Sequence, residues 1–279
     1  MSDAPQRLFL IDGSSYIYRA YYAIRHLSNS QGMATNAIYG FTTMLLKVMR
    51  ESAPDQLAVI FDSKGPTFRK DIYPEYKANR SAMPEDLAPQ IPYIKQVVQG
   101  FNLPAIEQSG YEADDIIATL ARRFSEQGLE VTIVSGDKDL MQVVSDRVVM
   151  LDTMKDKTFG PAEVAERFGG ADKVIEVQAL AGDSSDNVPG VPGIGEKTAR
   201  MLIEQYGDIE TLLSSLDQLK GKRRENLEKF ADQARLSKRL VTLVDDMELD
   251  LAQENFVLTE PNRDALTVLF KECEFHKLL

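Results

Sequence analysis

The hydrophobic residues of this chain fall into short, fully apolar runs that alternate with longer segments of helical spacing. Apolar runs of this length, with no polar face, are typical of strands in a parallel sheet. The four runs cover residues 7–11, 57–61, 130–135 and 147–151. The helical spacing covers residues 37–50, 84–99 and 112–127. This alternation predicts an α/β domain over residues 1–180, with a mostly parallel central sheet flanked by helices.

The pattern changes after about residue 183. Turns rich in Gly and Pro alternate with helical patterns, and no further strand is predicted. We therefore expect a second, helical subdomain over residues 181–279. The sequence ends on an apolar helical pattern (ALTVLFKECEFHKLL), which favours a domain excised from a longer protein.

Acidic residues follow three of the predicted strands. The carboxyl ends of parallel strands meet at one edge of a sheet, which is where ligands bind in open α/β folds. A second acidic group opens the helix predicted at residues 112–127, and a third lies in a turn after residue 182. The nine carboxylates are those of Asp12, Asp62, Glu112, Asp114, Asp115, Asp137, Asp139, Asp183 and Asp186.

Two interpretations of these acids remain open from the pattern alone. Each acid by itself could be a helix cap or a first-turn residue that complements the helix dipole. Crowded carboxylates repel one another, however, and a hard cation such as Mg²⁺ or Mn²⁺ relieves that repulsion. Nine acids exceed the ligands of one octahedral ion, so the grouping favours two neighbouring ions, the arrangement used in phosphodiester hydrolysis.

Charge and composition narrow the candidate partners. The chain has 32 Lys and Arg against 43 Asp and Glu, a net charge of −11, so any binding to nucleic acid must use local basic patches. One Cys and two His exclude a disulfide framework and a zinc cluster. No apolar run exceeds five residues, so we expect neither a signal peptide nor a membrane span, and a cytoplasmic location.

Two segments are locally basic. Residues 64–80 carry five bases and two acids, and a helix there would place Tyr73, Tyr76, Lys77 and Arg80 on one face. Such a face suits single-stranded nucleic acid, and a solvated surface helix with its tyrosines on the core explains it equally well. Residues 217–240 carry eight bases and four acids, for which a solvated helix is the slightly favoured interpretation.

Residues 190–200 (GVPGIGEKTAR) contain two tight glycine turns before a helical pattern. A phosphate-binding P-loop is excluded, because Glu196 separates Gly195 from Lys197 and no apolar strand precedes the turns. The pattern predicts a hairpin between helices, whose backbone N–H groups meet a phosphate without reading base sequence.

Several of these segments together resemble one known family. LIDGSSYIYRAYYA, VIFD, YKANR, YEADDIIATLA, SGDKDL and GDSSDNVPGVPGIGEKTA are similar to the 5′ nuclease domains of bacterial DNA polymerase I, within the flap endonuclease family. The resemblance runs from about residue 7 to the C-terminus. It implies a structure-specific, metal-dependent nuclease with a helical arch at about residues 64–84. It also implies a helix–three-turn–helix hairpin at about residues 186–206 that grips duplex DNA.

The metal ligands that the resemblance implies form two sets. The first metal ion would be surrounded by Asp12, Asp62, Glu112 and Asp114. The second would be surrounded by Asp137, Asp139 and Asp186, with Asp114 nearby. Asp115 and Asp183 would either bind a metal ion directly or hold the residues that do.

The resemblance also implies bases, an aromatic residue and a hairpin that meet DNA. Lys77 and Arg80 match the arch bases at the scissile phosphate, Tyr76 matches a stacking residue, and Arg19 matches a base near the site. K⁺ would bind to backbone carbonyls of the hairpin. The hairpin residues in contact with DNA would be Gly190, Gly193, Gly195 and Lys197.

These inferences predict a 5′-3′ exonuclease and flap endonuclease that serves primer removal and DNA repair by two-metal catalysis. In the predicted mechanism, metal-activated water attacks a phosphodiester in line, and Lys77 stabilises the charge on phosphate oxygens. We expect a monomer that binds DNA with a 5′ flap or 5′ end. It is either followed by a polymerase domain in a longer protein or is a standalone relative. The alternatives are a catalytically weak DNA-junction-binding module and an acid-rich phosphatase for small phosphoesters.

Overall fold

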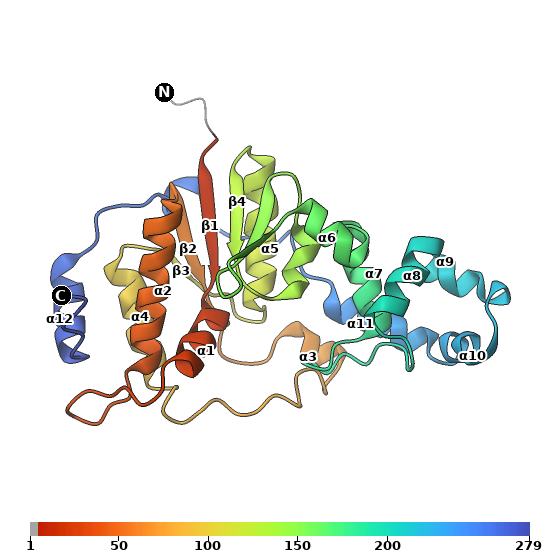
Figure 1. Ribbon diagram of the computed structural model, residues 1–279, viewed down its shortest axis with the longest axis horizontal. Coiled ribbons are helices and arrows are strands. Elements are labelled where there is room, and N and C mark those ends of the chain that lie inside the picture. Colours follow the sequence, from red (N-terminus) through yellow and green to blue (C-terminus); the bar gives the residue numbers. More distant parts are fainter. Residues whose placement is uncertain (1–4) are drawn as a thin grey trace.

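The computed structural model describes residues 5–279 and is built around one six-stranded sheet (Figure 1). The strand order is β3-β2-β1-β4-β5-β6, in which the first five strands pair in parallel and β6 pairs antiparallel to β5. The strands are β1 (Arg7–Asp12), β2 (Gln56–Ile60), β3 (Ala105–Ile106), β4 (Glu130–Val134), β5 (Val148–Asp152) and β6 (Lys157–Phe159). The predicted α/β class with a mostly parallel sheet is confirmed.

Helices cover both faces of this sheet, because its central strands are apolar on both sides. In β1, Phe9 and Ile11 belong to one buried cluster, whereas Leu8 and Leu10 belong to the other. The first face packs against α1 (Gly13–Ala23), α2 (Asn36–Ser52), α4 (Gln90–Gly100) and α12 (Arg263–Glu272). The opposite face packs against α5 (Ala113–Glu126), the 3-10 helix η1 (Lys138–Val143) and α6 (Pro161–Phe168).

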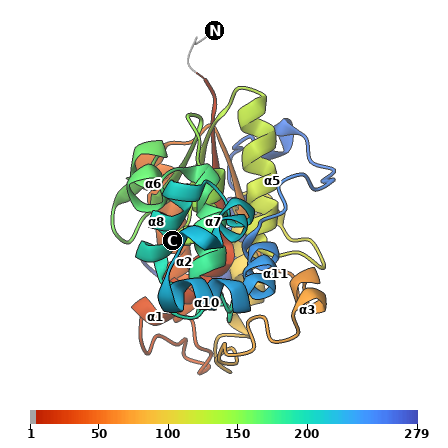
Figure 2. The same cartoon turned by 90° about the vertical axis from the view of Figure 1, so that its right-hand side faces the viewer.

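A second group of helices lies at one end of the sheet, on the right of Figure 1 and toward the viewer in Figure 2. The group consists of α7 (Ala171–Ala181), α8 (Glu196–Tyr206), α9 (Ile209–Ser214), η2 (Leu216–Gln218), α10 (Gly221–Lys229) and α11 (Ala231–Val241). After α11 the chain returns along α5 through η3 (Gln253–Phe256), where Phe256 packs edge-on against Phe124 with ring centroids 5.0 Å apart.

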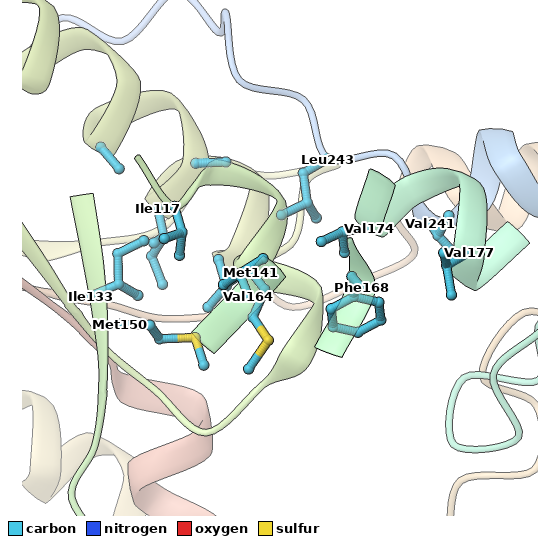
Figure 3. Packing of buried hydrophobic residues seen from close by; sticks show 14 of the residues in the cluster. Ile117, Ile133, Met141, Met150, Val164, Phe168, Val174, Val177, Val241 and Leu243 are labelled. Atoms are coloured by element: carbon cyan, nitrogen blue, oxygen red, sulfur yellow. The ribbon is translucent and has the colours of Figure 1, made fainter. Parts of the chain in front are cut away.

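One hydrophobic core joins the sheet to this helical half. Figure 3 shows Ile133 and Met150 of the sheet near Met141 of η1. Phe168 of α6 and Val174 of α7 continue the same cluster toward Val241 of α11. Because the cluster is continuous, the two halves are held together by burial of apolar surface. No helix in the described part of the chain combines the length and hydrophobicity that crossing a membrane requires.

All four predicted strands are present, and the structure adds β3 and β6, which are too short to give a recognisable pattern. The helix predicted over residues 84–99 begins only at Gln90. The helical face predicted through Tyr73, Tyr76, Lys77 and Arg80 is wrong. The short α3 (Phe68–Ile72) ends before Pro74, and Lys77 has a left-handed φ of 57°. The division at residue 180 stays a prediction.

A close approach of α1 and α2 leads to a prediction about stability. A Cβ atom on Gly40 would lie 2.8 Å from the Cβ of Ala20 and 3.1 Å from its Cα. Alanine usually stabilises a helix over glycine by about 0.5–1 kcal/mol, but here the added methyl group pushes the two helices apart. We expect Gly40→Ala to lower the free energy of unfolding by about 1–3 kcal/mol in chemical denaturation. Adding Ala20→Gly should restore part of the loss, whereas a stabilised single variant would contradict this packing.

Candidate active site

Three of the predicted acids meet at the carboxyl edge of the sheet. Asp12 is the last residue of β1, Asp62 lies two residues beyond β2, and Asp137 lies three residues beyond β4. The pairing of Ile11 with Val134, and of Asp12 with Ile60, brings these strand ends side by side. The parallel topology therefore places acids from widely separated parts of the sequence at one edge.

Local hydrogen bonds fix the orientation of these carboxylates. Asp12 caps α1 by accepting a hydrogen bond from the Ser15 amide (2.9 Å), and its other oxygen accepts one from Ser135 Oγ (2.8 Å). Asp62 Oδ1 accepts from the Ala113 amide at the start of α5 (2.8 Å). A carboxylate can therefore cap a helix and also belong to the acidic cluster, because its two oxygens have enough lone pairs for a backbone amide and a further partner.

The clustered acids hold protons more tightly than isolated ones. Burial, together with the charges of Asp62 and Asp137, raises the pKa of Asp12 from 3.8 to about 6. Burial and the charges of Asp137 and Asp12 raise the pKa of Asp114 as well. A raised pKa means that the ionised cluster opposes folding, and this cost develops as the pH rises from about 4 through 6. A bound divalent cation relieves the same repulsion.

A second acidic group lies beside the first, on η1 and the turn after α7. Burial and the charge of Asp137 raise the pKa of Asp139 to about 6. Gln178 Nε2 donates to Asp139 Oδ1 (2.5 Å), and the Lys138 ammonium lies between Asp139 and Asp183. Burial alone would raise the pKa of Asp183, but the hydrogen bond and charge of Lys138 and the hydrogen bonds from Ser185 together outweigh burial and lower that pKa. Sequence reasoning missed Lys138, whose place between two acids in GDKD was the available signal, and Gln178, for which there was none.

Bases from the segment after α3 pair with two further acids. Lys77 Nζ lies 2.7 Å from Glu112 Oε1 and 3.4 Å from Asp186 Oδ2, and Arg80 lies 2.5 Å from Asp186 Oδ1. The Lys77 amide also donates to the Asp186 carbonyl (2.9 Å). The structure therefore brings Lys77 and Arg80 to the acids, in spite of the missing helix.

The structure buries Tyr76, for which a stacking role was expected. Only 4% of its surface is exposed, and its hydroxyl donates to Glu112 and to Asp186. A ring enclosed in this way has no free face for a base. Tyr76 instead holds the two acids in place from behind.

Asp115 is also excluded as a direct metal ligand. Its carboxylate is fully buried and accepts from two nitrogens of Arg69, from the Glu112 amide and from the Val244 amide. Four donors use the lone pairs of both oxygens, so none remains for a cation. Sequence reasoning missed Arg69, because one base among five in residues 64–80 carries no sign of a buried partner.

Arg19 lies on α1 beside a cavity of about 440 Å³ that Asp137 and Gly136 also line. Its guanidinium donates to Thr153 Oγ1 (2.9 Å) and lies 3.6 Å from Asp152. Arg19 is thus a base at the edge of the acidic cluster, on the β5-β6 side. It makes no ion pair with the predicted metal ligands in the described part of the chain.

The predicted glycine hairpin joins α7 to α8. Gly193 (φ 80°), Gly195 and Lys197 are exposed at the turn and at the start of α8. Beside the turn lies a cavity of about 420 Å³ that Lys222 and Arg223 of α10 also line. This end of the helical half therefore presents glycine turns and bases to solvent.

Gly190 does not contribute to that exposed surface, contrary to prediction. It is buried, its amide donates to Ser237 Oγ (2.9 Å), and its carbonyl accepts from Gln233 (2.7 Å). A Cβ atom there would lie 2.4 Å from the Gly182 nitrogen. Glycine is required at this position because two backbone segments meet without space for a side chain.

The donors at the cluster suit a divalent cation by their chemistry. All are carboxylate oxygens, and Asp12, Asp114 and Asp139 have raised pKa values. In residues 5–279, no three acidic, cysteine or histidine side chains surround a common point as a metal requires. Lys77, Arg80 and Lys138 instead pair with the outer acids Glu112, Asp186 and Asp183.

Comparisons with known proteins identify a matching family and a similar fold. A family model for the N-terminal resolvase-like domain of 5′-3′ exonuclease matches residues 7–169, and one for its C-terminal SAM fold matches residues 170–264. A crystal structure of the bacteriophage T5 D15 flap endonuclease, in a complex with DNA and metal ions, superimposes with a TM-score of 0.72. The identity is 20%, and the match covers 95% of this chain and 99% of that one.

Two sequence relatives cover nearly the whole chain. DNA polymerase I of Rhizobium leguminosarum is 50% identical over 97% of this chain, which corresponds to 28% of that protein. The 5′-3′ exonuclease of Aquifex aeolicus is 39% identical over 98% of this chain and 93% of its own length. The chain thus spans less than a third of the polymerase relative and nearly all of the exonuclease relative. On the two family models and these identities, it belongs to the 5′-3′ exonuclease family.

Proposed function

We propose that this chain hydrolyses DNA phosphodiesters at 5′ ends and 5′ flaps, as a 5′-3′ exonuclease and flap endonuclease in primer removal and DNA repair. The observation that carries the proposal is the group of mutually repelling carboxylates formed by buried Asp12 and half-buried Asp114 and Asp137. Beside this group, the bases Lys77 and Arg80 pair with Glu112 and Asp186. Membership of the exonuclease family supports it. Such a site combines cation-binding oxygens with positive charge for a phosphate.

Two Mg²⁺ ions, or Mn²⁺ in their place, fit the carboxylates better than any softer metal. Asp12, Asp62, Glu112 and Asp114 would hold the first ion, and Asp137, Asp139 and Asp186 would hold the second. Asp183 would act behind them through Lys138. Bound ions of this kind polarise water and stabilise negative charge on phosphate oxygens.

The chain's own bases would orient the scissile phosphate. In this structure Lys77 and Arg80 neutralise Glu112 and Asp186. A phosphate entering the site would compete with these carboxylates for the two basic side chains. Exchanging a carboxylate partner for a phosphate leaves each base paired, so the step costs little desolvation. Tyr76 would keep Glu112 and Asp186 in place during this exchange.

Duplex DNA would bind at the hairpin of residues 186–206. Gly193 and Gly195 leave the backbone accessible, and Lys197, Lys222 and Arg223 supply positive charge near it. These groups suit backbone phosphates, so recognition would follow the shape of the junction with little base readout. We further propose that K⁺ binds hairpin carbonyls, that the chain acts as a cytoplasmic monomer, and that a polymerase portion follows it in the native protein. A catalytically weak junction-binding module is the alternative.

A product ladder from a 5′-labelled flap tests the proposal directly. We expect short labelled products with Mg²⁺ and none after chelation with EDTA, because the carboxylates alone repel the phosphate backbone. Binding to the same flap without Mg²⁺ should persist through the hairpin. Binding without cleavage under both conditions would favour the junction-binding alternative.

Asp137→Asn separates a catalytic role from a capping role. The Asp137 side chain accepts from the Asp139 amide (3.0 Å), and an asparagine oxygen retains that bond. We expect single-turnover cleavage to fall by about 100-fold or more, with unchanged thermal unfolding. Metal-free DNA binding should hold or tighten, because one repelling charge is removed.

The matched control for that variant is Asp208→Asn. Asp208 caps α9 through the Thr211 amide (2.7 Å), in the helical half and away from the cluster. It should cleave at the wild-type rate. Near-normal cleavage by folded Asp137→Asn protein would remove Asp137 from the proposed catalytic set.

Lys77→Ala tests whether this base acts at the reacting phosphate. We expect the single-turnover rate at saturating DNA to fall by about 100-fold, with little change in duplex affinity. Lys95→Ala is the control, since Lys95 also pairs with a glutamate (Glu107, 2.5 Å) but lies on α4. If affinity collapses while the saturated rate is kept, Lys77 is only a docking contact.

A further inference from the structure

Arg69 lies in α3, at the start of the segment that carries Lys77 and Arg80, yet only 1% of its surface is exposed. Its Nε donates to the Leu240 carbonyl (2.8 Å), and one terminal nitrogen donates to the Thr242 carbonyl (3.0 Å). Both terminal nitrogens donate to Asp115 at 2.8 Å. The planar guanidinium thus spans partners that no other side chain could join at once.

Asp115 extends these contacts to the active site. Besides Arg69, it accepts from the Glu112 amide (3.1 Å) and from the Val244 amide (2.9 Å). Glu112 in turn pairs with Lys77 and lies 3.5 Å from Arg69 itself. One fully hydrogen-bonded pair therefore contacts the backbone of Glu112 on one side and the end of α11 on the other.

Three segments far apart in the sequence converge on this pair. They are α3, the first turn of α5, and the chain just after α11, which links the helical half to the rest of the fold. The hairpin proposed to bind duplex DNA packs against α11 through Gly190, Ser237 and Gln233. The pair consequently lies on the path between the DNA-binding hairpin and Glu112.

We infer that Arg69 is a positioning residue, which sets the placement of Glu112 and of the segment bearing Lys77 relative to the helical half that holds the duplex. This inference rests on the nuclease function proposed above. Arg69 does not contact DNA, since it is enclosed by protein. Its effect passes through Asp115 and Glu112, and it acts on the reaction rate at saturating DNA.

Arg69→Lys and Arg69→Met test this role, with Arg123→Met as the matched control. Arg123 is also an arginine that donates to carbonyls of the chain after α11, those of Met247, Leu249 and Leu251. It lies near the far end of α5, away from Glu112. The measurements are single-turnover flap cleavage at saturating DNA, metal-free DNA affinity, and thermal unfolding, with cleavage assayed well below the lowest melting temperature.

We expect both Arg69 variants to cleave about 100-fold more slowly at saturating DNA, with metal-free affinity unchanged. Arg69→Lys should not rescue the rate, because lysine keeps the positive charge but lacks the planar guanidinium that donates to Asp115, Leu240 and Thr242 at once. Arg123→Met should keep the wild-type rate even where it lowers the melting temperature. Combining Arg69→Met with Asp115→Asn should slow cleavage no further than either change alone, since the two side chains act as one unit.

Arg69 variants that cleave as fast as Arg123→Met would overturn the inference and leave Arg69 a stabilising residue only. If Arg69→Met does not fold, Arg69→Lys and Asp115→Asn decide the question in the same way. If none of them folds, Arg69 is a folding determinant and the inference fails. Absence of cleavage by the wild-type chain would instead refute the proposed function, and the inference with it.

Discussion

Carboxylates crowded at the carboxyl edge of the sheet repel one another, and the surrounding fold must hold them together against that repulsion. Hydrogen bonds from Ser15 and Ser135 hold Asp12, and the first amide of α5 holds Asp62. Bases hold the outer acids, as Lys77 does for Glu112 and Lys138 does for Asp183. The interior acids keep raised pKa values, so their repulsion is reduced but not removed. The unrelieved part makes the cluster receptive to a cation.

The framework of the fold was predictable from the sequence, because the buried strands appear as short apolar runs and the helices that cover them have helically spaced apolar residues. Asp12, Asp62 and Asp137 were predictable as neighbours, since each follows a strand of one parallel sheet. The course of the segment after α3 was not predictable, because it depends on contacts with residues distant in the sequence. One such contact joins the Lys77 amide to the Asp186 carbonyl. The local spacing of Tyr73, Tyr76, Lys77 and Arg80 predicted a helix. The tertiary contacts instead hold this segment in a non-helical course, in which Lys77 has a left-handed φ.

Two neighbouring acids in one motif also have roles that depend on tertiary contacts and could not be told apart from the sequence. Asp114 and Asp115 are adjacent in YEADD, and successive residues of a helix point in directions about 100° apart. Asp114 lies among the charges of Asp12 and Asp137, while Asp115 enters the core and meets Arg69. The sequence contains no mark that separates the two roles. The partner that decides them is 46 residues away from Asp115.

The sheet order also has a consequence for how the protein is made. β1 pairs with β4, whose residues come more than a hundred positions later, and the Arg69 side chain bonds to the Leu240 carbonyl. A ribosome that has released only the first hundred residues has produced Asp12 and Asp62 without Asp137 or the end of α11. Pairing over such separations comes late in folding. The acids of this site can therefore assemble only after residue 186 has emerged, so a shorter nascent fragment would carry an incomplete acidic cluster.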